Sequence, residues 1–127
     1  MIRTAVIAAA PLVLASTLPA TADWGGVAVN SDGVGWGYSA GWDTKNEARK
    51  RAMFYCHQFS ENNAGCEVVM TTRRCGAVVR GRISSQPKLF VAEARGRNQA
   101  ANAAIAQCRE AGGASCELRR EFCANDL

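Results

Sequence analysis

The sequence is poor in the residues that build metal sites. It contains a single His, His57, and its six Cys are separated from one another by at least six intervening residues. One His excludes a site made of several His, and zinc sites need Cys-x-x-Cys or Cys/His spacing, which these cysteines do not have. We therefore expect no bound metal and no cofactor.

Long hydrophobic runs and a strong excess of one charge are also absent. The N-terminal apolar run, residues 4–18, is shorter than the roughly 20 residues that a membrane-spanning helix needs. The formal net charge is only +4, whereas nucleic-acid-binding domains concentrate basic residues on one face. The sequence thus predicts neither a transmembrane segment after processing nor a nucleic-acid partner.

The N-terminal residues 1–22 have the three parts of a secretory signal peptide. Met1-Ile2-Arg3 is a short positive start, residues 4–18 are apolar, and Ala20-Thr21-Ala22 is a small-x-small cleavage site. We expect cleavage after Ala22 and export to the periplasm or the medium. No Cys lies near the cut to carry a lipid anchor, and residues 23–127 suffice for a single domain.

The cysteines indicate disulfides and an internal duplication. An even number of cysteines in a small exported chain is typical of a disulfide framework. They form two triplets about 50 residues apart, which suggests repeats at about 24–74 and 75–127. The triplets are Cys56, Cys66 and Cys75, and Cys108, Cys116 and Cys123. Aligning the repeats pairs Ala40/Ala92, Asn46/Asn98, Ala48/Ala100, Ala52/Ala104 and Cys56/Cys108.

The duplication favours one disulfide pairing among the many that six cysteines allow. In two of the favoured bridges, the end of a helix is joined to the start of the following strand. The third joins matching strand ends that a pseudo-twofold axis would bring together. The favoured bridges are Cys56–Cys66, Cys108–Cys116 and Cys75–Cys123.

Each repeat has the pattern of two strands, a helix and a third strand. Strands are expected at 26–30, 35–42, 67–72, 75–82, 89–95 and 117–122, with helices that begin at Thr44 and span 97–111. The second hairpin has a longer turn that carries Pro87. The expected core stripes of the helices are Ala48, Ala52, Tyr55 and Phe59, and Ala100, Ala104, Cys108 and Ala111. The pattern predicts an α+β fold in which two tandem ββαβ repeats form one sheet with two packed helices, stabilised by disulfides.

Several motifs carry a family resemblance. They are the signal peptide, Trp24-Gly-Gly-Val-Ala-Val, Gly35-Trp-Gly-Tyr-Ser39, an Ala-rich helix that ends in Cys, and Cys75-Gly-Ala-Val-Val. Together they resemble small exported bacterial domains of the domain-of-unknown-function family 4189, over about 24–123. The resemblance implies a tandem α+β repeat and export, with no established catalytic residues. The second half departs from the pattern, because Lys88-Leu-Phe-Val stands where a Gly/Trp-rich strand is typical.

The first Gly-rich strand carries candidate binding residues. Strand alternation places Trp36, Tyr38 and Trp42 on one face. If this face is exposed, it is a stacking platform for sugar rings or for a partner protein. If it is buried, it is core against the helices. The residue pattern leaves both alternatives open.

Basic residues are concentrated between Arg73 and Arg97, where only Glu93 opposes them. Arg80 and Arg82 share one strand face and are candidates for binding an anion or an acidic partner. The alternative is a charged sheet edge that resists pairing with other strands.

Catalytic arrangements find little support in the sequence. Cys56 and His57 are neighbours in a helix and point about 100° apart, and Cys56 is expected in a disulfide. No Gly-x-Ser-x-Gly motif is present. Glu67 and Glu117 occupy matching positions in the repeats and are the candidate carboxylate pair of a hydrolase.

We therefore favour a non-enzymatic exported module that binds an envelope component, such as a glycan, or another protein. One alternative is a small secreted hydrolase that uses paired carboxylates. Another is a structural or host-facing protein without a small ligand.

Overall fold

Each half of the chain folds into a hairpin, a helix and a third strand. The computed structural model describes residues 23–61 and 65–126, and the signal peptide predicted for residues 1–22 lies outside them. The elements are β1 (Trp24–Asn30), β2 (Trp36–Trp42), α1 (Lys45–Gln58), β3 (Cys66–Thr72), β4 (Cys75–Ile83), β5 (Gln86–Ala94), α2 (Arg97–Glu110) and β6 (Ala114–Cys123).

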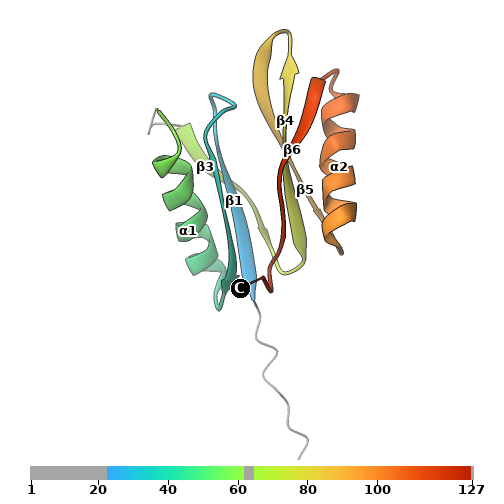
Figure 1. Ribbon diagram of the computed structural model, residues 1–127. Coiled ribbons are helices and arrows are strands. Elements are labelled where there is room, and N and C mark those ends of the chain that lie inside the picture. Colours follow the sequence, from blue (N-terminus) through green and yellow to red (C-terminus); the bar gives the residue numbers. More distant parts are fainter. Residues whose placement is uncertain (1–22, 62–64, 127) are drawn as a thin grey trace, which may run out of the picture.

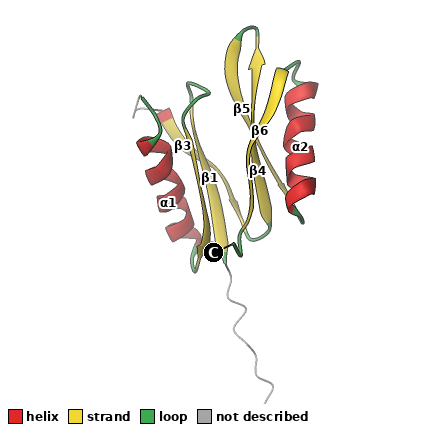
Figure 2. Ribbon diagram, viewed as in Figure 1, coloured by secondary structure: helices red, strands yellow, loops and turns green. Residues whose placement is uncertain are grey.

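The strands form two antiparallel three-stranded sheets, in the orders β2-β1-β3 and β5-β4-β6. The sheets lie face to face, with α1 outside the first and α2 outside the second (Figure 1; Figure 2). The α+β class, the two helices and the disulfide framework are thus confirmed. The arrangement of the strands differs from the single sheet that was expected.

Two sheets form because each central strand is apolar on both faces. Val27 of β1, Val78 of β4 and Phe122 of β6 are buried between the sheets. On the outer faces, Ala28 packs with α1 and Val79 packs with α2. A single sheet with both helices on one side would leave its other apolar face in water, whereas stacked sheets bury both faces.

The first helix lies close to its sheet because the facing residues are small. Ala48, Ala52 and Cys56 are fully buried on α1. Ser39 of β2 donates its hydroxyl to the backbone oxygen of Ala48 at 2.6 Å. A Cβ on Gly37 would lie only 2.4 Å from the backbone nitrogen of Cys56. The contact between α1 and β2 therefore depends on the absence of a side chain at Gly37.

The core stripe of each helix differs from the predicted one. The buried positions are Ala48, Ala52 and Cys56 in α1, and Ala100, Ala104 and Cys108 on the matching face of α2. Tyr55, Phe59 and Ala111 were predicted in the core but are exposed. At about 100° per residue, Tyr55 lies about 60° from the centre of the face formed by Ala48, Ala52 and Cys56, so it falls at the margin of that face and is exposed.

The three disulfides are Cys56–Cys66, Cys75–Cys123 and Cys108–Cys116, which is the pairing that the duplicated framework favours. Thr44, where the first helix was expected to begin, is the N-cap of α1. Thr44 Oγ1 accepts a hydrogen bond from the Glu47 N–H at 3.1 Å.

The second hairpin turn is shorter than predicted. Ser84 and Ser85 both have positive φ, 50° and 64°, as a two-residue hairpin turn of type I′ requires. Pro87 lies inside β5, opposite Arg82. The proline is tolerated there because β5 is an outer strand of its sheet and needs no outward N–H.

Replacing Gly37 with Ala should test the close packing of α1. We expect Gly37→Ala to lower the free energy of unfolding by about 3 kcal/mol, because the new methyl group forces the helix away from β2. Urea unfolding with the disulfides intact measures this change. Gly96→Ala is the control, since a Cβ there meets only the flexible end of Gln99. Equal losses in the two variants would contradict the argument.

Candidate binding groove

A groove of about 760 Å³ runs along the outer edge of β2, between α1 and β6. Apolar side chains make up one part of its lining, and charged side chains make up the other. The apolar part is Val34, Trp36, Tyr38, Ala40, Trp42, Tyr55 and Phe59. The charged part is Arg80, Arg119 and Asp126.

The aromatic side chains of the groove come from β2, from α1 and from Phe59, the residue that follows α1. Trp36 and Tyr38 are half-buried, with ring centroids 6.3 Å apart. Tyr38 also packs 5.1 Å from the Phe122 ring between the sheets. On the helix side, Tyr55 is 37% exposed and Phe59 is 67% exposed. The aromatic face of β2 is therefore core on its inner side and groove surface at its outer edge.

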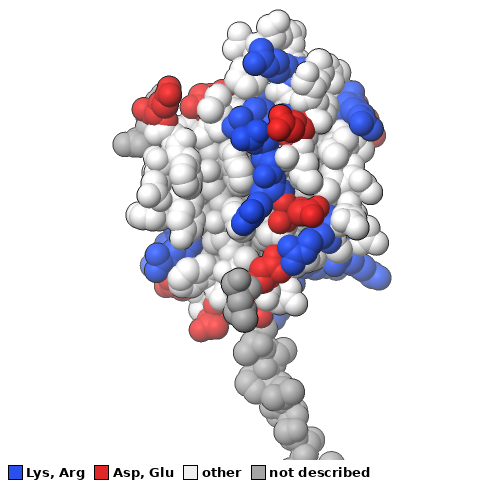
Figure 3. Space-filling view, viewed as in Figure 1, with Lys and Arg blue, Asp and Glu red and all other residues white. Residues whose placement is uncertain are grey.

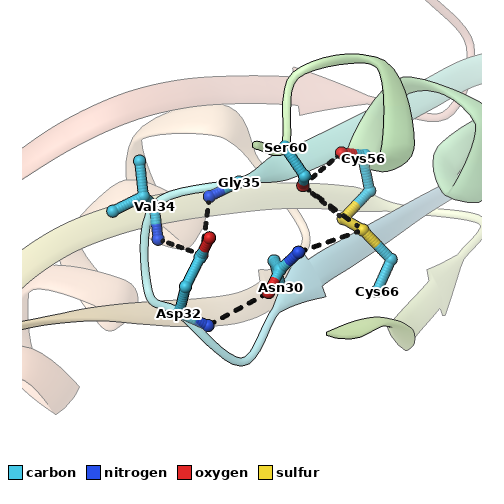
Figure 4. The surroundings of a disulfide bond; sticks show 7 residues. All are labelled: Asn30, Asp32, Val34, Gly35, Cys56, Ser60 and Cys66. Carbon is cyan, nitrogen blue, oxygen red and sulfur yellow. Dashed lines mark hydrogen bonds between the residues drawn. A yellow bond between two sulfur atoms is a disulfide. The ribbon is translucent and has the colours of Figure 1, made fainter. Parts of the chain in front are cut away.

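The end of the groove nearest Val34 is held by a disulfide and by the turn beside it (Figure 4). Asp32 Oδ1 accepts a hydrogen bond from the Val34 N–H at 2.8 Å, which closes the turn between β1 and β2. Ser60 Oγ donates to the backbone oxygen of Cys56 at 2.5 Å and lies 3.5 Å from Cys66 Sγ. The turn is thus closed by its own hydrogen bond, and the disulfide joins the end of α1 to the start of β3.

A stripe of basic side chains runs down the same face of the molecule, over β6 (Figure 3). Arg120 donates to the Tyr38 hydroxyl, and its guanidinium carbon lies 4.8 Å from the Tyr38 ring centroid. Arg80 Nη2 donates to the backbone oxygen of Val34 at 2.7 Å. Arg80 and Arg119 line the β6 side of the groove and make it basic, although Glu117, whose Oε1 lies 3.4 Å from Arg119 Nη1, offsets part of this charge.

Arg80 retains unused capacity for hydrogen bonding. Its Nε is buried and has no hydrogen-bond partner among the described residues. Burial lowers the pKa of the Arg80 guanidinium and the charge of Arg119 lowers it further, while Glu117 and Asp32 raise it. A bound carboxylate would act on the Arg80 pKa in the same direction as Glu117 and Asp32, because carboxylates form charge-assisted hydrogen bonds with guanidinium groups.

Asp126 lies at the other end of the groove, beside Gly41. Its Oδ2 accepts the Cys123 N–H at 2.8 Å, and its Oδ1 is paired with Arg97. Partial burial works to raise the pKa of Asp126, but the bonds from Cys123 and Arg97 outweigh it and hold that pKa below its usual range. The groove thus has a basic end and an acidic end whose carboxylate is already paired.

The structure gathers four of the five predicted binding residues in the groove. They are Trp36, Tyr38, Trp42 and Arg80. Arg82 is exposed on β4 outside the groove, near the turn of the β4–β5 hairpin. Arg82 comes two residues after Arg80, which is about 7 Å along a strand. Arg82 therefore lies outside the groove, although both side chains are on the same strand face.

The structure assembles neither of the two candidate catalytic pairs, Cys56 with His57 and Glu67 with Glu117. Cys56 is bonded to Cys66, so no thiol stands beside His57. Glu67 lies with His57 in a shallow depression beside α1, whereas Glu117 is on β6 in the other sheet. Among residues 23–61 and 65–126, no three His, Cys, Asp or Glu side chains gather as metal ligands.

Sequence reasoning missed Tyr55, Phe59 and Arg119 as groove residues. Tyr55 and Phe59 were assigned to the helix core. The alignment of the two halves offered a signal against this, because Tyr55 aligns with Gln107, a polar residue. Arg119 gives no such signal, since its place in the groove depends on the stacking of the two sheets.

A comparison with protein families finds a match to the Domain of unknown function (DUF4189) over residues 24–123. The chain belongs to the DUF4189 family. No curated protein and no solved structure matches the chain in the corresponding comparisons. Membership in the DUF4189 family confirms the resemblance seen in the motifs.

The covalent framework of this DUF4189 domain bears on its location. Three disulfides in a small domain fit an extracellular or periplasmic site, where oxidising conditions let such bonds persist. In the part of the chain that the structure describes, no helix is both long and apolar enough to cross a membrane.

Because of Asp126, the free energy of unfolding of the domain should decrease in acid. Its pKa is lower in the folded state than the unfolded value of about 3.9. The ionised carboxylate therefore stabilises the fold above about pH 4, and this contribution is lost as the pH falls through the folded-state pKa. We expect Asp126→Asn to lower the free energy of unfolding by about 0.5–1 kcal/mol at neutral pH. The difference should shrink below about pH 4.

Urea unfolding of both proteins at neutral pH and in acid measures the effect of Asp126→Asn. Glu61→Gln, which removes an exposed carboxylate, is the control and should change stability little at either pH. A difference between wild type and Asp126→Asn that stays constant into strong acid would contradict the argument.

Proposed function

We propose that this protein is an exported, non-enzymatic module that binds another protein through the groove beside β2. The observation that carries the proposal is the open aromatic wall. Phe59 is 67% exposed and Tyr55 is 37% exposed, beside the half-buried Trp36 and Trp42. Aromatic and Arg side chains are enriched in protein interfaces and carry much of their binding energy.

The covalent framework supports a binding role because it holds the groove in one shape. Cys56–Cys66 fixes the end of α1 to the start of β3, and Cys75–Cys123 joins β4 to the end of β6. A groove that is already formed loses little conformational entropy on binding. The arginines on its β6 side favour a partner with acidic groups over a neutral envelope glycan.

Export and internal duplication are parts of this proposal. Disulfides persist outside the reducing cytoplasm, which supports the predicted signal peptide at residues 1–22. The two halves share an element order and the disulfide from the helix end to the next strand, which supports repeats at about 24–74 and 75–127.

The full chain, expressed in a bacterium with its own N-terminus, should be exported and cleaved after Ala22. The exported protein should begin at Asp23. Its intact mass should be that of the chain from Asp23 onward, less two hydrogens for each disulfide. Mass spectrometry of periplasmic and medium fractions tests this result. Recovery of the protein in the membrane fraction with residues 1–22 retained would contradict it.

Replacing Phe59 with Ala should weaken partner binding without unfolding the protein, because the Phe59 ring is mostly in solvent. The exported protein is immobilised in its oxidised form and exposed to envelope and culture-fluid proteins of the producing bacterium. We expect one stoichiometric protein partner, whose recovery falls about tenfold with Phe59→Ala, as for an interface hot spot.

Val69→Ala is the matched control for Phe59→Ala. Val69 is also exposed, at 46%, but it lies on β3 and does not line the groove. Its removal should leave binding unchanged. Equal binding by the wild type and by Phe59→Ala would argue against the groove as the binding site.

A further inference from the structure

The outer edge of β2 is not covered by any other strand of the described chain. β2 pairs only with β1. The Asn30 N–H donates to the Gly35 oxygen at 2.7 Å, so the alternation of an antiparallel ladder directs the hydrogen bonds of Gly37 and Ser39 toward β1 as well. The N–H and C=O groups that face away from β1 belong to Trp36, Tyr38 and Ala40.

This free stretch of edge is bounded at both ends. Arg80 donates to the Val34 oxygen at 2.7 Å, and the Gly41 N–H donates to the Ala124 oxygen at 2.8 Å. The sequence of β2, WGYSAGW, contains neither the charged residues nor the Pro with which edge strands usually resist pairing. The edge is therefore a short, unprotected template for another strand, inside the groove.

The residues that line the two sides of the groove indicate which side chains would suit an added strand. Successive side chains of such a strand point alternately to the two faces of the sheet. On one face, α1 and its C-terminus present Tyr55 and Phe59. On the other face, the second sheet presents Arg80 and Arg119. The fitting strand alternates apolar with acidic residues.

We propose that β2 accepts an extended, acidic segment of a partner protein as a fourth strand of its sheet. The inference rests on the proposed function and names the chemistry of the partner at the same groove. Main-chain hydrogen bonds to Trp36, Tyr38 and Ala40 supply affinity, and the alternating side chains supply specificity. Carboxylates of the segment meet Arg80 and Arg119, and its apolar side chains meet the two exposed rings of the helix side.

A second copy of this chain fits the edge less well than an acidic segment. Antiparallel pairing of β2 with its own copy would place a twofold axis perpendicular to the sheet. Each sheet would then meet its own copy in the same layer, so β6 would face β6. The strand that the copy would add is β2, WGYSAGW, which brings no carboxylate to Arg80 and Arg119.

A peptide of defined sequence tests the proposal with the exported, disulfide-bonded protein. The probe is a seven-residue peptide, as long as β2, with blocked ends and alternating Glu and Val. Two further peptides carry N-methyl groups at alternate positions, one at the Glu residues and one at the Val residues. Fluorescence of the Trp residues or isothermal titration reports the affinity.

We expect the Glu/Val peptide to bind and one N-methylated peptide to lose about tenfold or more in affinity, with the other little changed, because only one set of N–H groups faces β2. Replacing Glu by Lys in the peptide should abolish binding. Arg119→Glu should weaken binding of the Glu peptide about tenfold and strengthen that of the Lys peptide. Arg82→Glu, which lies outside the groove, should change neither affinity.

Three results would overturn the proposal of an acidic added strand. They are no binding of the Glu/Val peptide at millimolar concentration, equal effects of the two N-methylated peptides, and equal affinity for the Glu and Lys peptides. A dimer in sedimentation that persists in the Arg119→Glu variant would point to a second copy as the occupant. If a Phe59-dependent protein partner is nevertheless recovered, the binding groove stands and only the mode of recognition is wrong.

Discussion

The close contact between α1 and its sheet determines the shape of the rest of the first half. Gly37 and Ser39 on β2 meet Ala48, Ala52 and Cys56 on α1 with no large side chain between them. Because the small residues occupy the contact, the large residues of the helix lie beside it. Tyr55 and the Phe59 that follows α1 therefore project past the edge of β2 and become the apolar wall of the groove. Because small residues fill the contact between helix and sheet, the large side chains of Tyr55 and Phe59 are left exposed instead of being buried in it.

The stacking of the two sheets supplies the other wall. Each half covers one face of its own sheet with its own helix and buries the other face against the second sheet. This places β6 beside β2, where Tyr38 packs on Phe122 and accepts a hydrogen bond from Arg120. Arginines from the second half therefore line a groove whose aromatic residues come from the first. The two halves share a fold but differ in sequence, since β2 carries Trp residues and β6 carries Arg residues. The groove that they form together is therefore asymmetric.

Much of the local structure follows from the sequence, and less of the site does. The strands, the cap at Thr44 and the cysteine pairing rest on short-range patterns or on covalent spacing, and the structure agrees with them. The core stripe of α1 was wrong at Tyr55, because both Tyr55 and Cys56 continue a helical pattern and only the packing on β2 decides between them. Arg82 was grouped with Arg80 on a shared strand face, but a face extends well beyond one site.

The sequence by itself determined the α+β class, the order of the elements, the two bridges between cysteines near in the chain, Cys56–Cys66 and Cys108–Cys116, and the aromatic face of β2. These depend on the periodicity of side chains and on spacing along the chain, which are local properties. Only the tertiary structure decided that the strands form two sheets, that β2 is an outer strand, and that Arg80 and Arg119 lie opposite Tyr55 and Phe59. The physical reason is that these features depend on which apolar faces bury one another, and that choice joins residues far apart in the chain.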